Sequence, residues 1–258
     1  MLIDFAGQVV IVSGGGRGIG RGLVERFVAE NATVVALDLA FDDQDDDDAL
    51  AGVRKLHCDV TDTASVRAAI DAVESEFGRI DVLVNNAGIN VEGEVESLDP
   101  ARWRACFDVN VFGVFALSQA VIPAMKRAGR GRIVNAASFA AIIPSVGAAA
   151  YGASKAAVVQ FTRVLASELG PWNITVNAYA PGMIPTAMNG FAELPEARQN
   201  RLLDTLSLRR WERPEDVADL VCFLASDYAG YLTGALIDVS GGKFATQLPN
   251  VAHERAAR

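Results

Sequence analysis

Short runs of β-branched and apolar residues recur along the chain. The first of them, Gln8–Val12, reads as apolar on both faces, which is typical of a buried strand in a parallel sheet. We expect strands at Gln8–Val12, Thr33–Leu37, Val53–Cys58, Asp81–Val84, Arg132–Asn135, Ile174–Ala178 and Ala235–Val239.

Between these runs, apolar residues recur at helical spacing. Ile19, Leu23 and Phe27 lie four residues apart, and Thr61 or Asp62 can cap a helix that runs to about Phe77. Pro214 suits the first turn of a helix that continues to about residue 225. Further helices are expected at about residues 100–112, 114–127 and 151–169.

Strands that alternate with helices favour an α/β fold, in which helices cover both faces of a parallel sheet. The chain has no linker-like stretch, shift in composition or internal repeat. We therefore expect one domain over residues 1–258, with a tail after Gly242 that the pattern does not place.

The charge of the chain argues against one class of partner. Lys and Arg number 23 and Asp and Glu number 32 among 258 residues, which gives a formal net charge of −9. Such a chain is a poor candidate for nucleic acid, whose phosphates attract Lys and Arg. Much of the acidity lies in the Asp-rich run Asp42–Asp48. This run lacks the Gly and Glu of a calcium loop, so we expect a solvated loop there.

Cysteine and histidine are too scarce for a disulfide framework or a zinc motif. The three cysteines lie far apart, and there are two histidines. We therefore predict no metal and a reducing, cytoplasmic setting. The N-terminal residues do not resemble a signal peptide, and the most apolar region, Ala136–Ala157, is broken by Pro, Gly and Ser. We predict no membrane segment.

A glycine-rich run, Ser13–Gly20, lies between the first predicted strand and the first predicted helix. Glycines let the backbone approach a pyrophosphate, and the helix N-terminus offers it free N–H groups. A plain loop would explain the glycines alone, but the strand before and the helix after favour a nucleotide site. Arg21 follows Gly20, so the run is not a Walker P-loop.

Asp38 ends the second predicted strand, where a carboxylate can accept hydrogen bonds from the adenosine ribose. Because a carboxylate there would repel a 2′-phosphate, Asp38 favours NAD over NADP. Arg17 weakly favours NADP, since a basic residue in the loop could bind a 2′-phosphate. The plain alternative for Asp38 is an exposed residue at the end of a strand.

From about Gly7 to Gly242 the chain resembles the short-chain dehydrogenase/reductase family. The resemblance rests on an ordered set of motifs, which is far more specific than any single one. These are Gly14-x-x-x-Gly18-x-Gly20 (with Ser13 where Thr is more usual), Asp59-Val60, Asn85-Asn86-Ala87-Gly88, Asn110, Ser138, Tyr151-x-x-x-Lys155, and Pro181-Gly182 with Thr186.

The resemblance implies a doubly wound Rossmann domain with a seven-stranded, mainly parallel sheet. It also implies a cofactor site and a catalytic set. The cofactor site comprises Gly14, Arg17, Gly18, Ile19, Gly20, Asp38, Asp59, Val60, Asn86, Ala87, Gly88, Tyr151, Lys155, Pro181, Gly182, Ile184 and Thr186. The catalytic set comprises Asn110, Ser138, Tyr151 and Lys155.

The chemistry of the catalytic set can be argued from the residue types. Tyr151 and Lys155 are four residues apart on a predicted helix, so both project from one face. A phenol has a pKa near 10, and we expect the nearby ammonium to lower it, so that Tyr151 can exchange a proton with an alcohol or ketone. Ser138 can hold the substrate oxygen. By resemblance, Lys155 also binds the nicotinamide ribose, and Asn110 positions a water.

Each of these residues has a structural alternative. Tyr and Lys at this spacing are common on helix surfaces, and Ser138 could cap a local turn. Asn110 could be a polar residue at a helix bend. Asn85 and Asn86 could tie the end of a strand to its neighbours, a role that is compatible with the functional one.

In the resembled family, substrate specificity lies largely after Pro181-Gly182, which here means about residues 183–213. This segment is fairly apolar, and with Phe139, Ile142 and Ile143 it suggests a hydrophobic pocket. Core packing is the alternative for its leucines. The apolar residues of the segment are Met183, Ile184, Met188, Phe191, Leu194, Leu202, Leu203 and Leu206.

We therefore predict an NAD-dependent oxidoreductase that interconverts a small apolar secondary alcohol and its ketone. An NADPH-dependent 3-oxoacyl-[acyl-carrier-protein] reductase is the first alternative, with basic residues from Lys126 to Arg132 near the pocket mouth for the acidic carrier. Trp172, where such reductases tend to carry Arg, and Asp38 count against it. A non-catalytic nucleotide sensor is the second alternative. The resemblance also implies a homotetramer.

Overall fold

The protein is described by a computed structural model that covers residues 2–41, 52–186 and 190–256. The Asp42–Asp48 run and Met188 therefore lie outside the described residues. The described residues form one sheet of seven strands in the order β3-β2-β1-β4-β5-β6-β7, and every neighbouring pair is parallel. The strands are β1 Val9–Ser13, β2 Thr33–Asp38, β3 Arg54–His57, β4 Val82–Asn85, β5 Gly131–Ala136, β6 Ile174–Pro181 and β7 Leu236–Val239.

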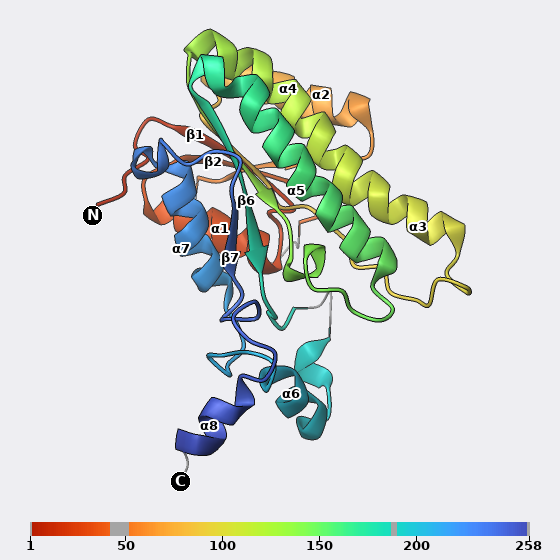
Figure 1. The fold of residues 1–258 in the computed structure, drawn as a ribbon. Helices are drawn as coiled ribbons and strands as arrows, with labels where there is room; N and C mark the ends of the chain where they lie inside the picture. The colour runs from red at the N-terminus through yellow and green to blue at the C-terminus, as the bar shows by residue number, and fades with distance from the viewer. Residues whose placement is uncertain (1, 42–51, 187–189, 257–258) are drawn as a thin grey trace.

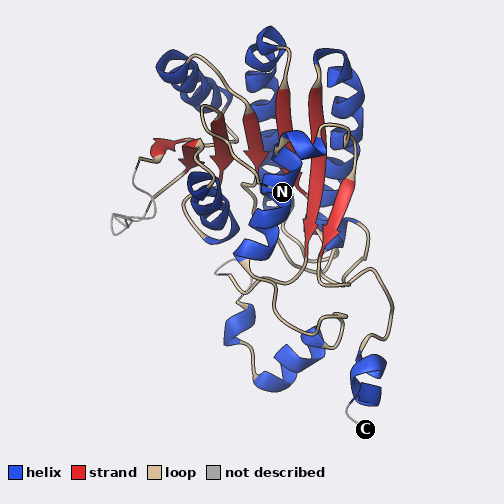
Figure 2. Cartoon of the chain, turned by 90° about the vertical axis from the view of Figure 1, so that its left-hand side faces the viewer, coloured by secondary structure: helices blue, strands red, loops and turns tan. Residues whose placement is uncertain are grey.

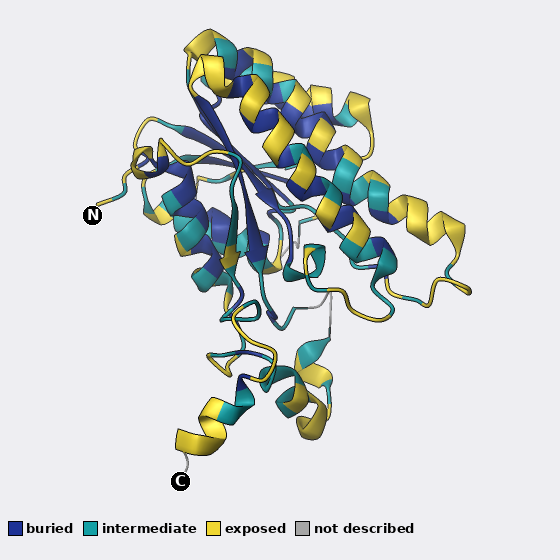
Figure 3. Ribbon diagram, viewed as in Figure 1, coloured by how far each residue is buried: buried dark blue, intermediate teal, exposed yellow. Residues whose placement is uncertain are grey.

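Helices cover both faces of this sheet (Figure 2). Successive residues of a strand point to opposite faces, so Val10 and Val12 pack in one core and Val9 and Ile11 in the other. The first core is closed by α1 Gly18–Ala29 and α7 Pro214–Ala225; the second is closed by α2 Thr63–Phe77, α4 Gly113–Ala128 and α5 Ala149–Leu169. Figure 3 shows the central strands buried between helices whose exposed residues lie on their outer sides, whereas the edge strands β3 and β7 are only partly covered. The expected doubly wound α/β fold is confirmed.

Residues 100–128 form one continuous helical run rather than two separate helices. The run consists of α3 Pro100–Phe107, the π-helical turn η2 Asp108–Phe112 and α4. It is the one described helix that is long and apolar enough to cross a membrane by length and composition. Because Leu117, Val121 and Met125 of α4 pack in the core against the sheet, this run is explained by its place in the fold.

The topology places the ligand-binding edge of the sheet. The chain turns outward in opposite directions from β1 and β4, which are neighbours, and such a switch point opens a crevice at the carboxyl ends of the strands. Two helices that the sequence pattern did not predict, α6 Glu196–Leu203 and α8 Asn250–Ala256, lie beyond this edge (Figure 1).

Candidate active site

A cleft of about 600 Å³ opens at the carboxyl edge of the sheet. Residues from the ends of β1, β2, β4, β5 and β6 and from α5 line it, although they are far apart in the sequence. The cleft brings together Gly14, Arg17, Gly18, Ile19, Gly20, Asp38, Asp59, Val60, Asn86, Ala87, Gly88, Ser138, Tyr151, Lys155, Pro181, Gly182, Ile184 and Thr186. Of the residues predicted for the site, Asn110 alone does not line it.

The glycine-rich loop is packed so closely that two positions exclude any side chain. A Cβ on Gly20 would lie 1.8 Å from the carbonyl oxygen of Gly14, and a Cβ on Gly14 would lie 2.9 Å from the Cα of Ala87. Gly14 also has a φ of 65°, which favours glycine. The loop therefore presents bare backbone to the cleft, as close approach by a pyrophosphate requires.

The N-terminus of α1 faces the same cleft without a side-chain cap. Arg17 occupies the N-cap position in an extended conformation, and its side chain accepts no bond from the first turn. The free N–H groups and the positive end of the helix dipole therefore remain available for an anion. These features fit the pyrophosphate of a dinucleotide.

Asn86 and Ser13 fasten this loop to the end of β4. The Ser13 Oγ accepts from the backbone N–H groups of Asn86 and Ala87, both at 3.1 Å. The Asn86 Nδ2 donates to the carbonyl oxygens of Ser13 and Gly14, and its Oδ1 accepts from the Tyr179 hydroxyl at 3.1 Å. The Ser that replaces the more usual Thr thus makes the connection that holds two walls of the cleft together.

Asp38 is fixed at the end of β2 by the backbone around it. Its Oδ2 accepts from the N–H of Gly16 at 2.9 Å, and its Oδ1 accepts from the N–H of Leu39 at 2.8 Å. The carboxylate is therefore oriented before any ligand arrives. Asp59 is held in a similar way, since its Oδ1 accepts from both the N–H and the hydroxyl of Thr61.

Tyr151 and Ser138 lie together in the cleft, one at the start of α5 and the other just after β5. A hydrogen bond to Ser138 lowers the pKa of Tyr151, but burial has the larger effect and raises that pKa above its ordinary value. Ser138 also accepts from the N–H of Ala140 at 3.1 Å and so caps the short η3 helix Phe139–Ala141. Ser138 therefore caps a local turn, as the structural alternative proposed, and also lines the cleft.

Lys155 is buried one turn further along α5. Its Nζ donates to the carbonyl oxygen of Ala136 at 2.8 Å and lies 5.8 Å from the centre of the Tyr151 ring. Burial lowers the pKa of Lys155 to about 8. The expected lowering of the Tyr151 pKa by this ammonium is not found here: burial raises that pKa, and the bond to Ser138, rather than Lys155, is the influence that lowers it.

Asn110 lies in the π-helical turn η2 behind the cleft. Its Oδ1 accepts from the N–H of Ile89 at 2.8 Å, and its Nδ2 donates to the carbonyl oxygen of Ile89 at 3.0 Å. A Cβ on Gly88 would lie 3.2 Å from the Asn110 Oδ1 and 3.4 Å from the Lys155 Nζ, so the two side chains are close neighbours. Asn110 therefore shapes the loop beside Lys155. The sequence alternative placed Asn110 at a helix bend, and the structure has a π-helical turn there within a continuous run.

Glu212 is a site residue that the sequence analysis missed. Its Oε2 accepts from the N–H of Gly182 at 2.5 Å, whereas its buried Oε1 has no partner among the described residues. Burial raises the pKa of Glu212 to about 8, helped by Asp216 and Asp238 and opposed by the bond to Gly182 and by Arg210. It thus holds the Pro181-Gly182 segment from behind. Nothing near it in the sequence marks a buried carboxyl group.

In the wild type, we expect the free energy of unfolding to fall as the pH rises toward about 8, because Glu212 loses its proton. We expect Glu212→Gln to abolish this fall. Glu212 has a folded-state pKa of about 8, which lies above its unfolded value near 4.3. Its contribution is therefore complete below the unfolded value and is lost as the pH rises through the folded value. Between about pH 5 and about pH 8 the free energy of unfolding should fall by a few kcal/mol in the wild type but not in the variant.

Urea unfolding of both proteins at the two pH values measures this difference. The glutamine can still accept from the N–H of Gly182, so the hydrogen bond itself is retained. Glu215→Gln, at an exposed position three residues away, is the matched control and should behave as the wild type. An equal pH dependence in Glu212→Gln and the wild type would contradict the assignment.

The apolar segment after Gly182 divides between the protein core and the edge of the cleft. Ile184 is buried and also lines the cleft, whereas Met183 and Leu206 are buried without lining it. Phe191 stacks on Trp211 with ring centres 5.6 Å apart. Core packing, the alternative considered for the leucines, therefore accounts for Leu206.

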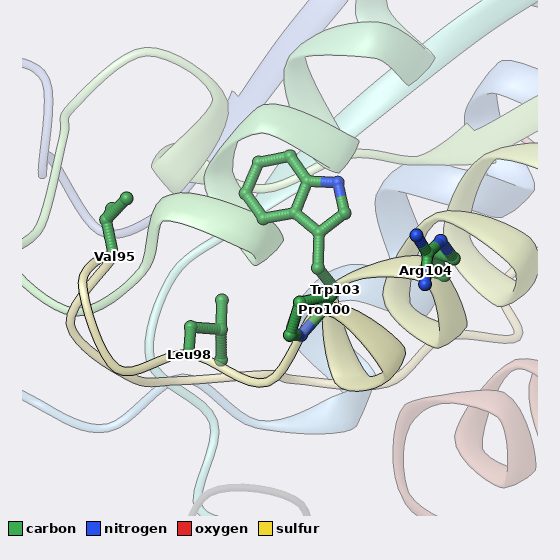
Figure 4. Close-up of a pocket in the computed structure, with 5 residues that line it drawn as sticks. All are labelled: Val95, Leu98, Pro100, Trp103 and Arg104. Atoms are coloured by element: carbon green, nitrogen blue, oxygen red, sulfur yellow. The ribbon is translucent and has the colours of Figure 1, made fainter.

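A second, smaller hollow of about 220 Å³ lies at the start of α3 (Figure 4). It is lined by Val95, Leu98, Pro100, Trp103 and Arg104. Because it gathers no acid, base or nucleophile and lacks the glycine loop, the larger cleft is the candidate active site.

Comparison with known proteins agrees with this geometry. Residues 14–243 match the family model described as Enoyl-(Acyl carrier protein) reductase. The chain is 41% identical over 250 residues to a 3alpha-hydroxysteroid dehydrogenase of Mediterraneibacter gnavus, with 93% of this chain and 98% of that protein covered. It is 39% identical over 241 residues to the 3-oxoacyl-[acyl-carrier-protein] reductase FabG of Thermotoga maritima, with coverages of 92% and 97%.

The similarity extends to the fold. The crystal structure of gox2181 matches with a TM-score of 0.87 at 33% sequence identity, covering 94% of this chain and 98% of that one. A family model and relatives that span nearly the whole chain, together with the glycine loop and cleft described above, show that the chain belongs to the short-chain dehydrogenase/reductase family of oxidoreductases.

Proposed function

We propose that the protein is an NAD-dependent oxidoreductase that interconverts a secondary alcohol and its ketone. The observation that carries the proposal is the pairing of two walls in one cleft. One wall is the bare backbone of the glycine loop; the other holds Ser138, Tyr151 and Lys155. A bound nicotinamide would accept the hydride of the alcohol carbon, or return it to the ketone.

The side chains of this chain handle the proton and the substrate oxygen. Ser138 donates a hydrogen bond to that oxygen and fixes it beside Tyr151. Tyr151 takes the hydroxyl proton when the alcohol is oxidised and returns it when the ketone is reduced. Lys155, anchored on Ala136, has further N–H groups for the nicotinamide ribose. Asn110 positions the loop at Gly88 and Ile89 against Lys155.

The cofactor preference rests on Asp38. Its carboxylate is held at the cleft by Gly16 and Leu39, where it can accept from ribose hydroxyls and repel a 2′-phosphate. Arg17 also lines the cleft and would favour NADP. We give Asp38 the greater weight, because two backbone bonds fix its orientation.

We expect Asp38→Ala to lose most of the preference for NAD over NADP. The substitution removes the repulsion of the 2′-phosphate together with an acceptor for the ribose, so the ratio of kcat/KM values should shift toward NADP by about ten- to a hundredfold. Initial rates with both cofactors measure the shift. A wild-type enzyme that already prefers NADP would contradict the assignment.

For the substrate, we propose a small secondary alcohol with an apolar body. The named hydroxysteroid dehydrogenase among the relatives acts on a cyclic secondary alcohol, and Ile184 and Pro185 supply apolar surface at the cleft. A homotetramer belongs to the proposal, and exposed aromatic residues at the end of η2 and on α4 support self-association, since Phe112 and Phe115 are 37% and 41% exposed. A cytoplasmic location stays a prediction.

The acyl-carrier-protein reductase is the second candidate, favoured by the FabG relative. The basic residues that would receive the acidic carrier are, however, not at the pocket mouth as expected. Arg132 is the second residue of β5 and is buried against Asp227, and Lys126 lies over the Trp172 ring, both at the amino edge of the sheet. The cleft opens at the opposite edge, so this group of residues does not support carrier docking there.

A cofactor-coupled screen tests the proposal. The protein is mixed with NAD or NADP and a panel of secondary alcohols, and the absorbance of the reduced cofactor is followed. Turnover with NAD supports the enzyme. Tight binding of NAD without turnover across a wide panel would instead favour a nucleotide sensor on the same fold.

A further inference from the structure

Lys243 occupies a place that the sequence analysis left unassigned. It follows the glycines Gly241 and Gly242 after β7, at the same carboxyl edge of the sheet as the cleft. Its Nζ lies 5.5 Å from the centre of the Phe139 ring and donates to the hydroxyl of Thr205. Thr205 lies just beyond α6, so one ammonium joins three segments at this edge of the sheet, and the three residues lie outside the lining of the cleft itself.

This ammonium has no carboxylate partner among the described residues. Several other cations of the chain are paired: Arg79 with Asp81, Arg210 with Asp216, and Arg26 with Glu30. Lys243 is only partly exposed, and burial lowers its pKa. A partly buried charge without a counter-ion is unfavourable, and an anion beside it would relieve that cost.

The position of Lys243 relates it to the chemistry. Phe139 directly follows Ser138, which lines the cleft beside Tyr151. The ring contact and one peptide unit therefore place the ammonium at most about 15 Å from the Ser138 hydroxyl. A six-membered ring that carries a hydroxyl at one end and an anionic group at the other spans roughly 7 Å between the two groups, which lies within this upper bound. Two of the three Lys243 N–H groups remain for such a group.

We propose that Lys243 binds a carboxylate of the substrate, so that the enzyme acts on a hydroxy acid or the corresponding oxo acid. The inference rests on the proposed oxidoreductase function and narrows its substrate class. The apolar body of the substrate lies against the apolar residues at the cleft, and its charged end meets Lys243 and Thr205. Lys243 is then a specificity-determining residue and takes no part in the proton transfer of Tyr151.

The test uses two probes that differ only in charge, cyclohexanecarboxylate and cyclohexanecarboxamide. Their dissociation constants from the NADH complex are measured by calorimetry at neutral pH. We expect the carboxylate to bind about ten- to a hundredfold more tightly than the amide to the wild type, as a charge-assisted hydrogen bond allows. Lys243→Met should remove this difference and Lys243→Arg should largely retain it.

Lys126→Met is the matched control, because Lys126 lies over Trp172 at the opposite edge of the sheet. It should keep the difference between the probes, and all three variants should bind NADH as the wild type does. On an alcohol that the enzyme turns over, a carboxylated homologue should have a KM that rises in Lys243→Met with little change in kcat.

Two outcomes overturn the inference. If NADH binds and the carboxylate binds no better than the amide, or if Lys243→Met keeps the preference, Lys243 is not an anion site and the oxidoreductase proposal still stands. If NADH does not bind at all, the proposed oxidoreductase function is wrong, and the inference about Lys243, which depends on it, is wrong as well.

Discussion

Tyr151→Phe is expected to abolish turnover while leaving the binding of NADH close to that of the wild type. The substitution removes one hydroxyl group from the cleft and keeps the ring. General acid–base catalysis contributes about 10²- to 10⁴-fold to a rate, and the cleft offers Tyr151 as the proton-transfer group beside Ser138. We therefore expect kcat to fall by at least about 10²-fold in both directions, measured by cofactor absorbance.

The pH dependence of the wild type provides a second measurement on the same residue. Because burial raises the pKa of Tyr151, the phenol is protonated at neutral pH and is ready to donate to a ketone. Alcohol oxidation needs the phenolate, so its rate should rise with pH while ketone reduction does not. A Tyr151→Phe enzyme with undiminished kcat would remove the residue from the mechanism.

Gly20→Ala is expected to destroy cofactor binding. The new Cβ would lie 1.8 Å from the Gly14 carbonyl oxygen and 2.7 Å from the Asn86 Nδ2, and the first of these contacts is with backbone that has no room to yield. The loop must shift, and the hydrogen bond from the Asn86 Nδ2 to the Gly14 carbonyl oxygen breaks with it. We expect NADH affinity, measured by fluorescence titration, to fall by more than about a hundredfold, with a loss of stability of about 1–3 kcal/mol or more.

Gly170→Ala is the matched control for this substitution. Gly170 has a helical φ of −48°, and a Cβ there would meet no atom within 4 Å. It should bind NADH as the wild type does and unfold at a similar temperature. Normal NADH binding by Gly20→Ala would show that the loop is not the cofactor cradle.

The pattern of apolar residues was sufficient to predict the seven strands and the helices that cover them, because the central strands are apolar on both faces and each covering helix buries one apolar face. The seventh strand is parallel to the others, so the sheet is wholly rather than mainly parallel. α8 escaped prediction because Asn250–Ala256 is short and buries no residue, which leaves it without a hydrophobic period. The continuity of the run from Pro100 was also missed, since a π-helical turn interrupts the spacing of a regular helix.

The site was predictable where short-range spacing carries the chemistry, as in the glycine loop and in the pair of Tyr151 and Lys155. Properties that depend on burial were not. The expected lowering of the Tyr151 pKa was wrong because spacing shows proximity but not desolvation. Glu212 and Lys243 were missed because their surroundings come from segments distant in the chain, Gly182 for one and Phe139 for the other.

The π-helical turn at Asp108–Phe112 allows one helical run to direct one side chain toward the site and another toward the outer surface. A π turn accommodates one residue more than an α turn, so the side chains that follow it are rotated by about 100° from where an unbroken helix would place them. Asn110 within the turn can thus face inward to the Ile89 loop while Phe115, shortly after it, is turned toward the outer surface. Deleting one residue from the turn would restore regular α-helical winding from α3 to α4. Side chains on the two sides of the turn could then no longer both keep their present orientations, inward for Asn110 and outward for Phe115.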